Sequence, residues 1–123
     1  MDLIEFKPGQ RRGDERPTLS ISPKGWMRFN KIAVERLGLE AGMRVKFYQD
    51  KKEPLDWYFK TSDEGAQLRK EHKKNGCLVF NFSLVAAKIL AALKKDTAVL
   101  VRVATTPVDG VHEGYYAILT RSA

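Results

Sequence analysis

Residues 18–47, TLSISPKGWMRFNKIAVERLGLEAGMRVKF, carry the pattern that indicates the fold. The first five of them alternate between polar and apolar side chains, as a half-buried strand does. Pro23-Lys24-Gly25 is typical of a tight turn, because glycine adopts a positive φ without strain. Residues 26–29 then resume an extended pattern, with Met27 and Phe29 on one face. The chain therefore has a predicted strand, turn and second strand here.

A short helix is predicted directly after this second strand. Asn30 is a favoured N-cap residue, and Gly38 supplies the C-cap of a helix over the residues between them. Apolar residues share one face of that helix and charged residues the other. Further on, Arg44 and Lys46 alternate with apolar neighbours in a third strand, and residues 57–59 return as its hairpin partner. This part of the chain is thus a strand–helix–hairpin unit.

The same order of elements recurs later in the chain. Residues 78–81, LVFN, correspond to residues 27–30, MRFN. A predicted helix over 83–93 follows, then a strand over 97–103, a turn that contains Pro107, and a second aromatic strand. The match is one of order and residue type rather than of constant spacing. We interpret it as an internal repeat.

The repeat divides the chain into an N-terminal arm (1–17), a first repeat (about 18–62), a connector (63–77) and a second repeat (about 78–123). The last three are expected to form a single barrel domain, with one more short strand over 66–69. The second repeat lacks the glycine turns of the first, and its helix is apolar on nearly every side, with Lys88 as its one charge. Such a helix must be covered by its own sheet or by another chain, so a homo-oligomer or protein partner is an open expectation.

Residues 18–47 resemble the AbrB/MazE/SpoVT-like swapped-hairpin family of bacterial DNA-binding proteins. The family signature is an alternating strand, a glycine, a strand ending in proline, a short helix closed by Leu-Gly-Leu, and then a glycine and a strand. The residues in register with it are Gly25, Met27, Phe29, Ala33, Leu37, Gly38, Leu39, Gly42 and Val45. The resemblance implies a β-rich α+β fold in which two strand-helix-hairpin repeats interlock as a swapped-hairpin, double-psi-like β-barrel. Two units in one polypeptide resemble the tandem MraZ arrangement.

The resemblance also implies a non-enzymatic DNA-binding protein of the transcription-regulator type. The chain departs from the family at Asn30, where proline is usual, and at Met43, where aspartate is common. Trp26 stands where the family has an arginine or glutamine whose side chain tends toward DNA. The alternative is therefore a protein–protein interaction module, antitoxin-like or an accessory factor, that has kept the barrel but not the DNA face.

The charge of the chain is compatible with an anionic partner. The formal net charge is +7, and residues 1–17 hold four basic and four acidic side chains, so the whole excess lies in the part expected to fold. Lysine and arginine side chains that contact phosphates release counterions and thereby favour nucleic-acid binding. DNA is the candidate partner, while a merely soluble basic protein is the other interpretation of the same charge.

Six basic residues of the first repeat are the candidate phosphate contacts. They are Lys24, Arg28, Lys31, Arg36, Arg44 and Lys46. Three of them, Arg28, Arg44 and Lys46, are expected on the sheet face opposite the core, where β-readers of a DNA groove present their side chains. They would equally form the solvated face of an ordinary half-buried sheet.

Five aromatic residues could offer stacking surfaces for single strands, although aromatic residues of hairpin strands more often belong to the core. They are Trp26, Trp57, Tyr58, Tyr115 and Tyr116.

The sequence has no pattern typical of an enzyme or of a cofactor site. It contains no nucleophile elbow, no phosphate-binding glycine loop and no residues spaced as metal ligands. His72 and His112 are expected at the surface, and the single cysteine, Cys77, fits a reducing compartment. No apolar run is long enough to span a bilayer, and residues 1–17 do not have the pattern of a signal peptide. A cytoplasmic protein with no catalytic activity, cofactor, metal or membrane partner is expected.

Overall fold

The computed structural model describes residues 16–71, 75–108 and 114–122. The strands in these ranges are β1 (Thr18–Ile21), β2 (Trp26–Phe29), β3 (Arg44–Gln49), β4 (Trp57–Ser62), β5 (Ala66–Gln67), β6 (Arg69–Lys70), β7 (Leu78–Asn81), β8 (Val99–Val103) and β9 (Tyr116–Leu119). The helices are α1 (Lys31–Leu37), α2 (Ser83–Leu93) and the short 3-10 helix η2 (Thr120–Ser122). All nine strands form one antiparallel sheet in the order β5-β3-β4-β9-β8-β1-β2-β7-β6.

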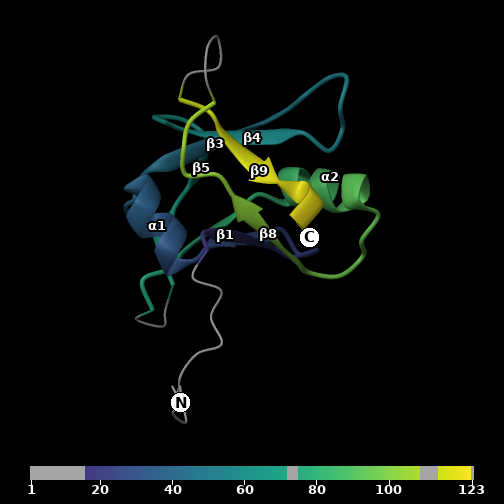
Figure 1. Ribbon diagram of the computed structural model, residues 1–123. Helices are drawn as coiled ribbons and strands as arrows, with labels where there is room; N and C mark the ends of the chain where they lie inside the picture. The colour runs from purple at the N-terminus through teal and green to yellow at the C-terminus, as the bar shows by residue number, and fades with distance from the viewer. Residues whose placement is uncertain (1–15, 72–74, 109–113, 123) are drawn as a thin grey trace, which may run out of the picture.

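One segment joins the two ends of this sheet. β5 and β6 stand at opposite ends of the strand order, yet Leu68 alone separates them along the chain. The Leu68 amide donates to the Met43 carbonyl, and the Leu68 carbonyl accepts from the Gly42 amide, both at 2.8 Å. The sheet is therefore a nearly closed barrel, and Figure 1 shows α1 and α2 on opposite sides of it. The predicted β-rich α+β class, with the strands forming a barrel, is confirmed.

The pairing of β2 with β7 forms a symmetric seam through the barrel. The opposed residues are Met27 and Phe80, Arg28 and Val79, and Phe29 and Leu78. The internal repeat aligns residues 27, 28 and 29 with residues 78, 79 and 80. Exchanging the aligned residues leaves the same three pairs. The seam thus has an approximate two-fold axis at the pair of Arg28 and Val79.

The same axis relates two glycine turns. Gly25 lies three residues before Arg28 and Gly76 three residues before Val79, and both have a positive φ, of 93° and 77°. The expectation that the second half lacks the glycine turns of the first is corrected for this turn alone, because α2 ends at Lys94 where α1 ends at a glycine. The equivalent of the first turn lies in the connector, just outside the range assigned to the second repeat.

Each half pairs its leading strand with the hairpin of the other half. β1 leads into β2 and pairs on its other side with β8, where Leu19 is opposite Val101. The β5–β6 segment leads into β7 and pairs on its other side with β3, where Val45 is opposite Ala66. The connector therefore supplies a strand that links the two halves, where the sequence predicted one short strand over 66–69.

Aromatic rings fill the centre of the barrel. Phe29, Phe59 and Phe80 are fully buried, and the Phe29 ring centroid lies 5.2 Å from that of Phe59 and 5.7 Å from that of Phe80. Phe47 stacks on Phe80 at 5.7 Å. Met27 is also buried, so the predicted inward face of residues 26–29 is confirmed.

The two helices lie at the predicted positions, but their termini are stabilised differently. The Asn30 side chain accepts a hydrogen bond from the Ala33 amide at 2.9 Å, and Gly38 closes α1 with a φ of 65°, so both predicted caps are confirmed. α2 buries one face through Val85, Ala86, Ile89 and Leu90. Its opposite side is exposed at Leu84, Ala87, Lys88 and Ala91, so the barrel of the same chain covers half of this helix. Neither helix in the described part of the chain is long and apolar enough to cross a membrane.

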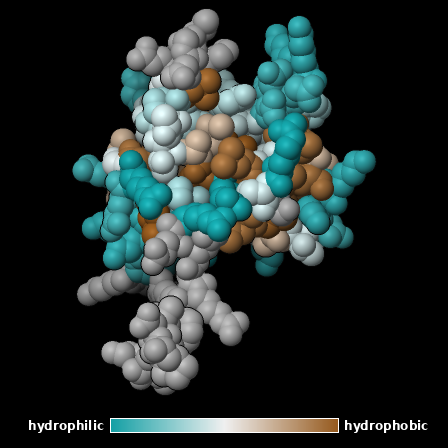
Figure 2. Space-filling view, in the orientation of Figure 1, coloured by the Kyte–Doolittle hydropathy of each residue, from teal (hydrophilic) through white to brown (hydrophobic). Residues whose placement is uncertain are grey.

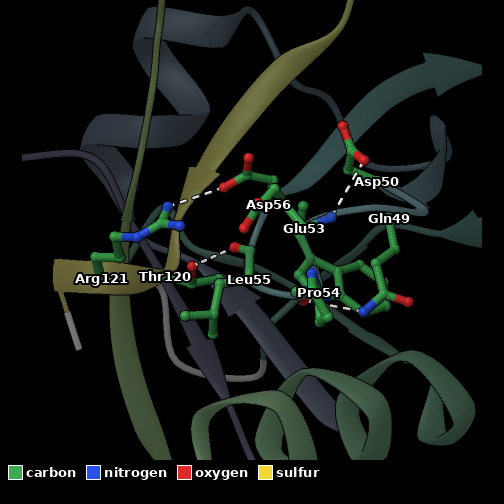
Figure 3. Close-up of polar contacts among 9 residues, drawn as sticks. Gln49, Asp50, Glu53, Pro54, Leu55, Asp56, Thr120 and Arg121 are labelled. Atoms are coloured by element: carbon green, nitrogen blue, oxygen red, sulfur yellow. Dashed lines mark hydrogen bonds and ion pairs between the residues drawn. The ribbon is translucent and has the colours of Figure 1, made fainter.

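The C-terminal end of the described chain is fastened to the β3–β4 hairpin. Arg121 Nη1 lies 2.8 Å from Asp56 Oδ1, and the buried Thr120 hydroxyl donates to the Leu55 carbonyl (Figure 3). Within the hairpin turn, the amide groups of Lys52 and Glu53 donate to the Asp50 carboxylate. The hydrogen bond with Asp56 raises the pKa of Arg121. These contacts tie the β3–β4 hairpin to η2, which directly follows β9.

Candidate nucleic-acid interface

A groove of about 630 Å³ lies over the outer face of β1, β2, β7 and β6. Its lining residues are Ser20, Ser22, Trp26, Met27, Arg28, Arg69, Lys70, Glu71 and Val79. Three of these are cations, one is a carboxylate and one is a tryptophan. This surface, hereafter the Trp26 groove, therefore combines an excess of positive charge with a large apolar ring.

The alternation of β2 places Trp26 and Arg28 in the groove. Met27 and Phe29 point into the core, so the residues between and before them point outward. Gly25 precedes this strand and packs so tightly on the start of α2 that a Cβ atom there would lie 2.8 Å from Ser83 Cα. The Phe82 amide also donates to the Gly25 carbonyl at 2.9 Å. The beginning of β2 is thus held against a rigid element.

Two further cations reach the groove from β6. Arg69 is opposite Val79, which is in turn opposite Arg28, so the three residues form one row across the outer face. Neighbouring strands lie about 4.8 Å apart, which places the Arg28 and Arg69 backbones roughly 10 Å from each other. Lys70 is the next residue of this edge strand, opposite Leu78; it is exposed and lines both this groove and the hollow beside α1. Among the described residues, no carboxylate forms an ion pair with Arg69 or Lys70.

One carboxylate partly offsets this charge. Glu71 Oε1 lies 3.3 Å from Arg28 Nη1, while Glu71 Oε2 accepts from the Asn75 side-chain amide at 2.6 Å. The Arg28 side chain is 45% exposed and that of Glu71 22%. Exposed ion pairs contribute about 0–1 kcal/mol, and a guanidinium has five N–H donors. Arg28 therefore keeps donors for an anion while Glu71 holds its orientation.

The structure distributes the six predicted phosphate contacts around the barrel. Lys24 lies in the β1–β2 turn, Arg28 in the Trp26 groove, Lys31 and Arg36 on α1, and Arg44 and Lys46 on β3. Arg28, Arg44 and Lys46 do lie on the outer face, as predicted. However, β7, β6 and β5 stand between β2 and β3 in the closed barrel, so these three side chains do not form one row.

Two of the remaining cations are occupied by nearby carboxylates. Lys46 Nζ lies 2.8 Å from Glu64 Oε2, and Lys31 Nζ lies 3.9 Å from Glu35 Oε1. The hydrogen bond between Lys46 and Glu64 raises the pKa of the amine and lowers the pKa of the carboxyl group. Each pair is electrically neutral as a unit, so it attracts phosphate less than a free lysine would.

Arg69 and Lys70 are functional candidates that the sequence reasoning missed. They lie in the range assigned to the connector, and the candidate cations were taken from the first repeat alone. A signal was present, because the buried Leu68 stands between the polar Gln67 and Arg69 as in a half-buried strand. Alternation does not identify the partner strand. Arg69 lies in line with Arg28 because β6 and β2 both pair with β7.

Of the five aromatic stacking candidates, Trp26 alone is exposed. Its exposed fraction is 53%, whereas Trp57 is 3% exposed and donates its indole N–H to the Pro54 carbonyl at 3.0 Å. The other three, Tyr58, Tyr115 and Tyr116, are half-buried. The expectation that such residues belong to the core thus holds for Trp57 and not for Trp26.

A second aromatic surface lies on β3, β4 and the start of β9. The Tyr48 ring meets the Tyr115 ring edge-on at 4.9 Å, and Lys60 Nζ lies 5.0 Å from the centre of the Tyr115 ring. Burial raises the pKa of Tyr48. Because these rings are already partners of one another and of Lys60, they offer less free stacking area than Trp26.

An apolar patch lies on the strands next to the groove. Leu100 is 53% and Leu119 42% exposed. Arg102 is opposite Leu119, and Leu100 is the next outward residue of β8, so the two leucines are diagonal neighbours. Figure 2 shows apolar side chains gathered in the middle of the face on which β8 and β9 lie.

A larger hollow of about 850 Å³ lies between the end of α1 and β7. Its lining includes Val34, Leu39, Lys70, the half-buried free thiol of Cys77 and Leu78. In the described ranges there is no group of three or more histidine, cysteine or acidic residues that could hold a metal ion. His72 and His112 lie outside the described residues.

Comparison with protein-family models, with curated proteins and with solved structures finds no match to this chain.

Proposed function

We propose that this chain is a non-enzymatic DNA-binding protein of the transcription-regulator type that contacts phosphates through the Trp26 groove. The observation that carries the proposal is the convergence of Arg28, Arg69 and Lys70 on one groove from two distant parts of the sequence. Lysine and arginine contacts to phosphate supply most of the affinity of non-specific DNA binding.

The strand pairing supports the resemblance to the AbrB-like swapped-hairpin family. β1 pairs with the hairpin of the second half through β8, and the β5–β6 segment pairs with the hairpin of the first half through β3. A reciprocal exchange of this kind is what two interlocked units of that family would produce. Both units come from one polypeptide here, which is the tandem arrangement that the resemblance implies.

The proposal moves the expected interface. Of the six cations predicted from the sequence, Arg28 is central, and Lys24 lies in the turn next to it, where its amide donates to the Ser22 hydroxyl. Arg69 and Lys70 replace the cations of α1 and β3 as the principal phosphate contacts. Trp26 lies in the groove beside these cations and does not abolish the DNA face.

The test is fluorescence anisotropy of a labelled DNA duplex, titrated with salt. The test variant is Arg28→Ala/Arg69→Ala/Lys70→Ala, and its matched control is Arg36→Ala/Lys88→Ala/Lys95→Ala. The control removes the same charge from exposed positions outside the groove. Each lost phosphate contact reduces the steepness of log K against log salt by about 0.9. The slope of the groove variant should therefore be shallower by roughly 2 to 3.

Two outcomes would contradict the proposal. The first is the absence of duplex binding by the unaltered protein at low salt. The second is an equal loss in both triple variants, which would show that net charge, and not the groove, attracts DNA. Circular dichroism of each variant checks that the fold is kept.

The second candidate function, a protein–protein interaction module, is favoured by the exposed pair of Leu100 and Leu119. Apolar side chains that adjoin one another at the surface often mark a contact with another protein. Sedimentation of the protein and of Leu100→Glu/Leu119→Glu tests its homo-oligomeric form. An oligomer that the double substitution dissociates would support this function, and a monomer in both cases would exclude self-association through this patch.

A further inference from the structure

We infer that the Trp26 groove takes an unpaired nucleic-acid strand, with one base stacked on the Trp26 indole and the adjoining phosphates at Arg28, Arg69 and Lys70. The inference rests on the proposed function in one respect, namely that the partner is a nucleic acid. It goes further by naming the form of nucleic acid and a specific contact residue.

The first observation is the state of the Trp26 ring. It is 53% exposed on a strand whose next residue, Met27, is fully buried, so the register of the strand holds the ring outside the core. Among the described residues Trp26 takes part in no ring-to-ring or cation–π contact, in contrast to Tyr48 and Tyr115. An exposed tryptophan with a free face is an unused stacking surface.

The second observation is the space beside the ring. Ser20 of β1 and Ser22, just after that strand, line the groove. The Ser22 amide donates to the Trp26 carbonyl at 2.9 Å, so Ser22 is the neighbour of Trp26 across the strand pair. Both side chains are small. They leave the groove open on the side of Trp26 that faces β1, with a volume of about 630 Å³.

The third observation is the position of the cations relative to the ring. Arg28 is the next outward residue after Trp26 on β2, and Arg69 continues the same row two strands away. The groove therefore runs from an aromatic ring to a line of positive charges. Protein grooves that bind single strands without sequence preference combine these two elements, a stacking ring and a cationic track for the backbone.

The geometry favours an unpaired strand over a duplex. In a duplex each base face is covered by its stacked neighbours, so a protein meets base edges and phosphates. A ring held on a strand can then reach a base face only after the base is unstacked. An unpaired strand presents its base faces directly, and stacking on an aromatic side chain strengthens binding by roughly five-fold to 150-fold per base.

The test uses the fluorescence of Trp26 itself in the full chain. The chain has two tryptophans, and Trp57→Phe leaves Trp26 as the single reporter. An oligothymidylate and a DNA duplex with the same number of phosphates are titrated against this protein at one salt concentration. Single strands should quench the Trp26 emission and bind at least five-fold more tightly than the duplex.

The decisive variant is Trp26→Leu, with binding followed by anisotropy of labelled DNA. It should lower the affinity for the single strand by at least five-fold and leave duplex affinity within two-fold of the original, as an order of magnitude for one stacked base. Trp26→Phe should restore most of the loss, because phenylalanine keeps a stacking face. Tyr48→Leu removes an exposed aromatic ring outside the groove and should change neither affinity.

Three results separate the failure of this inference from that of the proposed function. Duplex binding that equals or exceeds single-strand binding, or a Trp26→Leu variant without effect, would overturn the inference and leave the proposed function standing. Absence of binding to either form would overturn both. Displacement of the single strand by polyglutamate at a matched charge, with equal quenching of Trp26, would assign the groove to an acidic protein partner instead.

Discussion

The two strand–helix junctions of the barrel start from the same Phe-Asn pair and use it differently. Asn30 follows Phe29 directly into α1, and its side chain accepts hydrogen bonds from the Ala33 and Thr18 amides and donates to the Arg16 carbonyl. Asn81 is separated from α2 by Phe82, and its side chain makes a long contact of 3.4 Å with the Lys24 carbonyl. α2 consequently has no side-chain cap.

One additional residue changes what holds the junction together. Phe82 turns its ring edge-on toward Phe47 at 6.1 Å, so the second junction is anchored by apolar packing. The first junction is anchored by three hydrogen bonds of one asparagine. The difference shows that two strand–helix junctions with the same Phe-Asn pair can be stabilised at the helix start by polar contacts in one case and by apolar packing in the other.

The largest effect should be the same in both halves. Phe29 and Phe80 are equivalent about the seam, both are fully buried, and their rings are in contact. Phe29→Ala and Phe80→Ala should each lower the free energy of unfolding by about 3–5 kcal/mol. Urea denaturation measures both. If the alanine variants do not fold, Phe29→Leu and Phe80→Leu should show equal smaller losses. A clear inequality would show that the two rings are packed differently by their surroundings.

A smaller and unequal effect is expected at the two glycine turns. A Cβ at Gly25 would lie 2.8 Å from the backbone Cα of Ser83, whereas one at Gly76 would meet the flexible Lys31 side chain at 2.9 Å. Both positions have a positive φ, which costs of order 1–3 kcal/mol for a residue with a side chain. Gly25→Ala should therefore destabilise the protein more than Gly76→Ala. Equal losses in thermal or urea denaturation would mean that backbone strain alone decides both.

The two asparagines should differ by about the value of a helix cap. Asn30→Ala removes the cap of α1 and leaves the Thr18 amide without its acceptor, so a loss of about 1–2 kcal/mol is expected. Asn81→Ala removes one long, exposed contact and should cost roughly 0.5 kcal/mol or less. Comparable losses in urea denaturation would show that Asn81 has a capping role that its position in the chain conceals.

The smallest effect should come from pH, because Glu64, the carboxyl group with a lowered pKa, is exposed and lies outside both junctions. The pKa of Glu64 is lowered by its hydrogen bond with Lys46, so the folded state holds this proton less tightly than the unfolded state does. The resulting stabilisation is present above the ordinary pKa of a glutamate and is lost as the pH falls through the lowered value. Glu64→Gln should reduce this acid-side loss slightly, while Asn30→Ala should destabilise the protein equally across that range. Denaturation curves at several acidic pH values compare the two.

Local features of the fold were predictable from the sequence because each depends on neighbouring residues. The bounds of α2, both caps of α1 and the inward face of Met27 and Phe29 follow from spacing within a few positions. The strand predicted over 97–103 begins at Val99 instead. Pairing with β1 sets that limit, since Val99 is opposite the last residue of β1.

The candidate site was predictable only in part. Arg28 was identified because alternation alone places it on the outer face, and Trp26 was noted as a departure from the resembled family. Arg69 and Lys70 were not identified, because their importance depends on the register with β7. Period-two alternation tells which face of the sheet a side chain lies on, but not which other strands lie beside it on that face.

By itself, the sequence determined the order of the main strands and helices, the inward face of Met27 and Phe29, and the excess of positive charge in the folding part. These depend on short-range spacing and on the burial preference of apolar residues. The tertiary structure alone decided that the β5–β6 segment closes the barrel, that Trp57 is buried while Trp26 is exposed, and that Arg28 and Arg69 share a row. The physical reason is that hydrogen-bonded strand partners in a barrel come from distant parts of the chain, so the composition of each surface is set by long-range register.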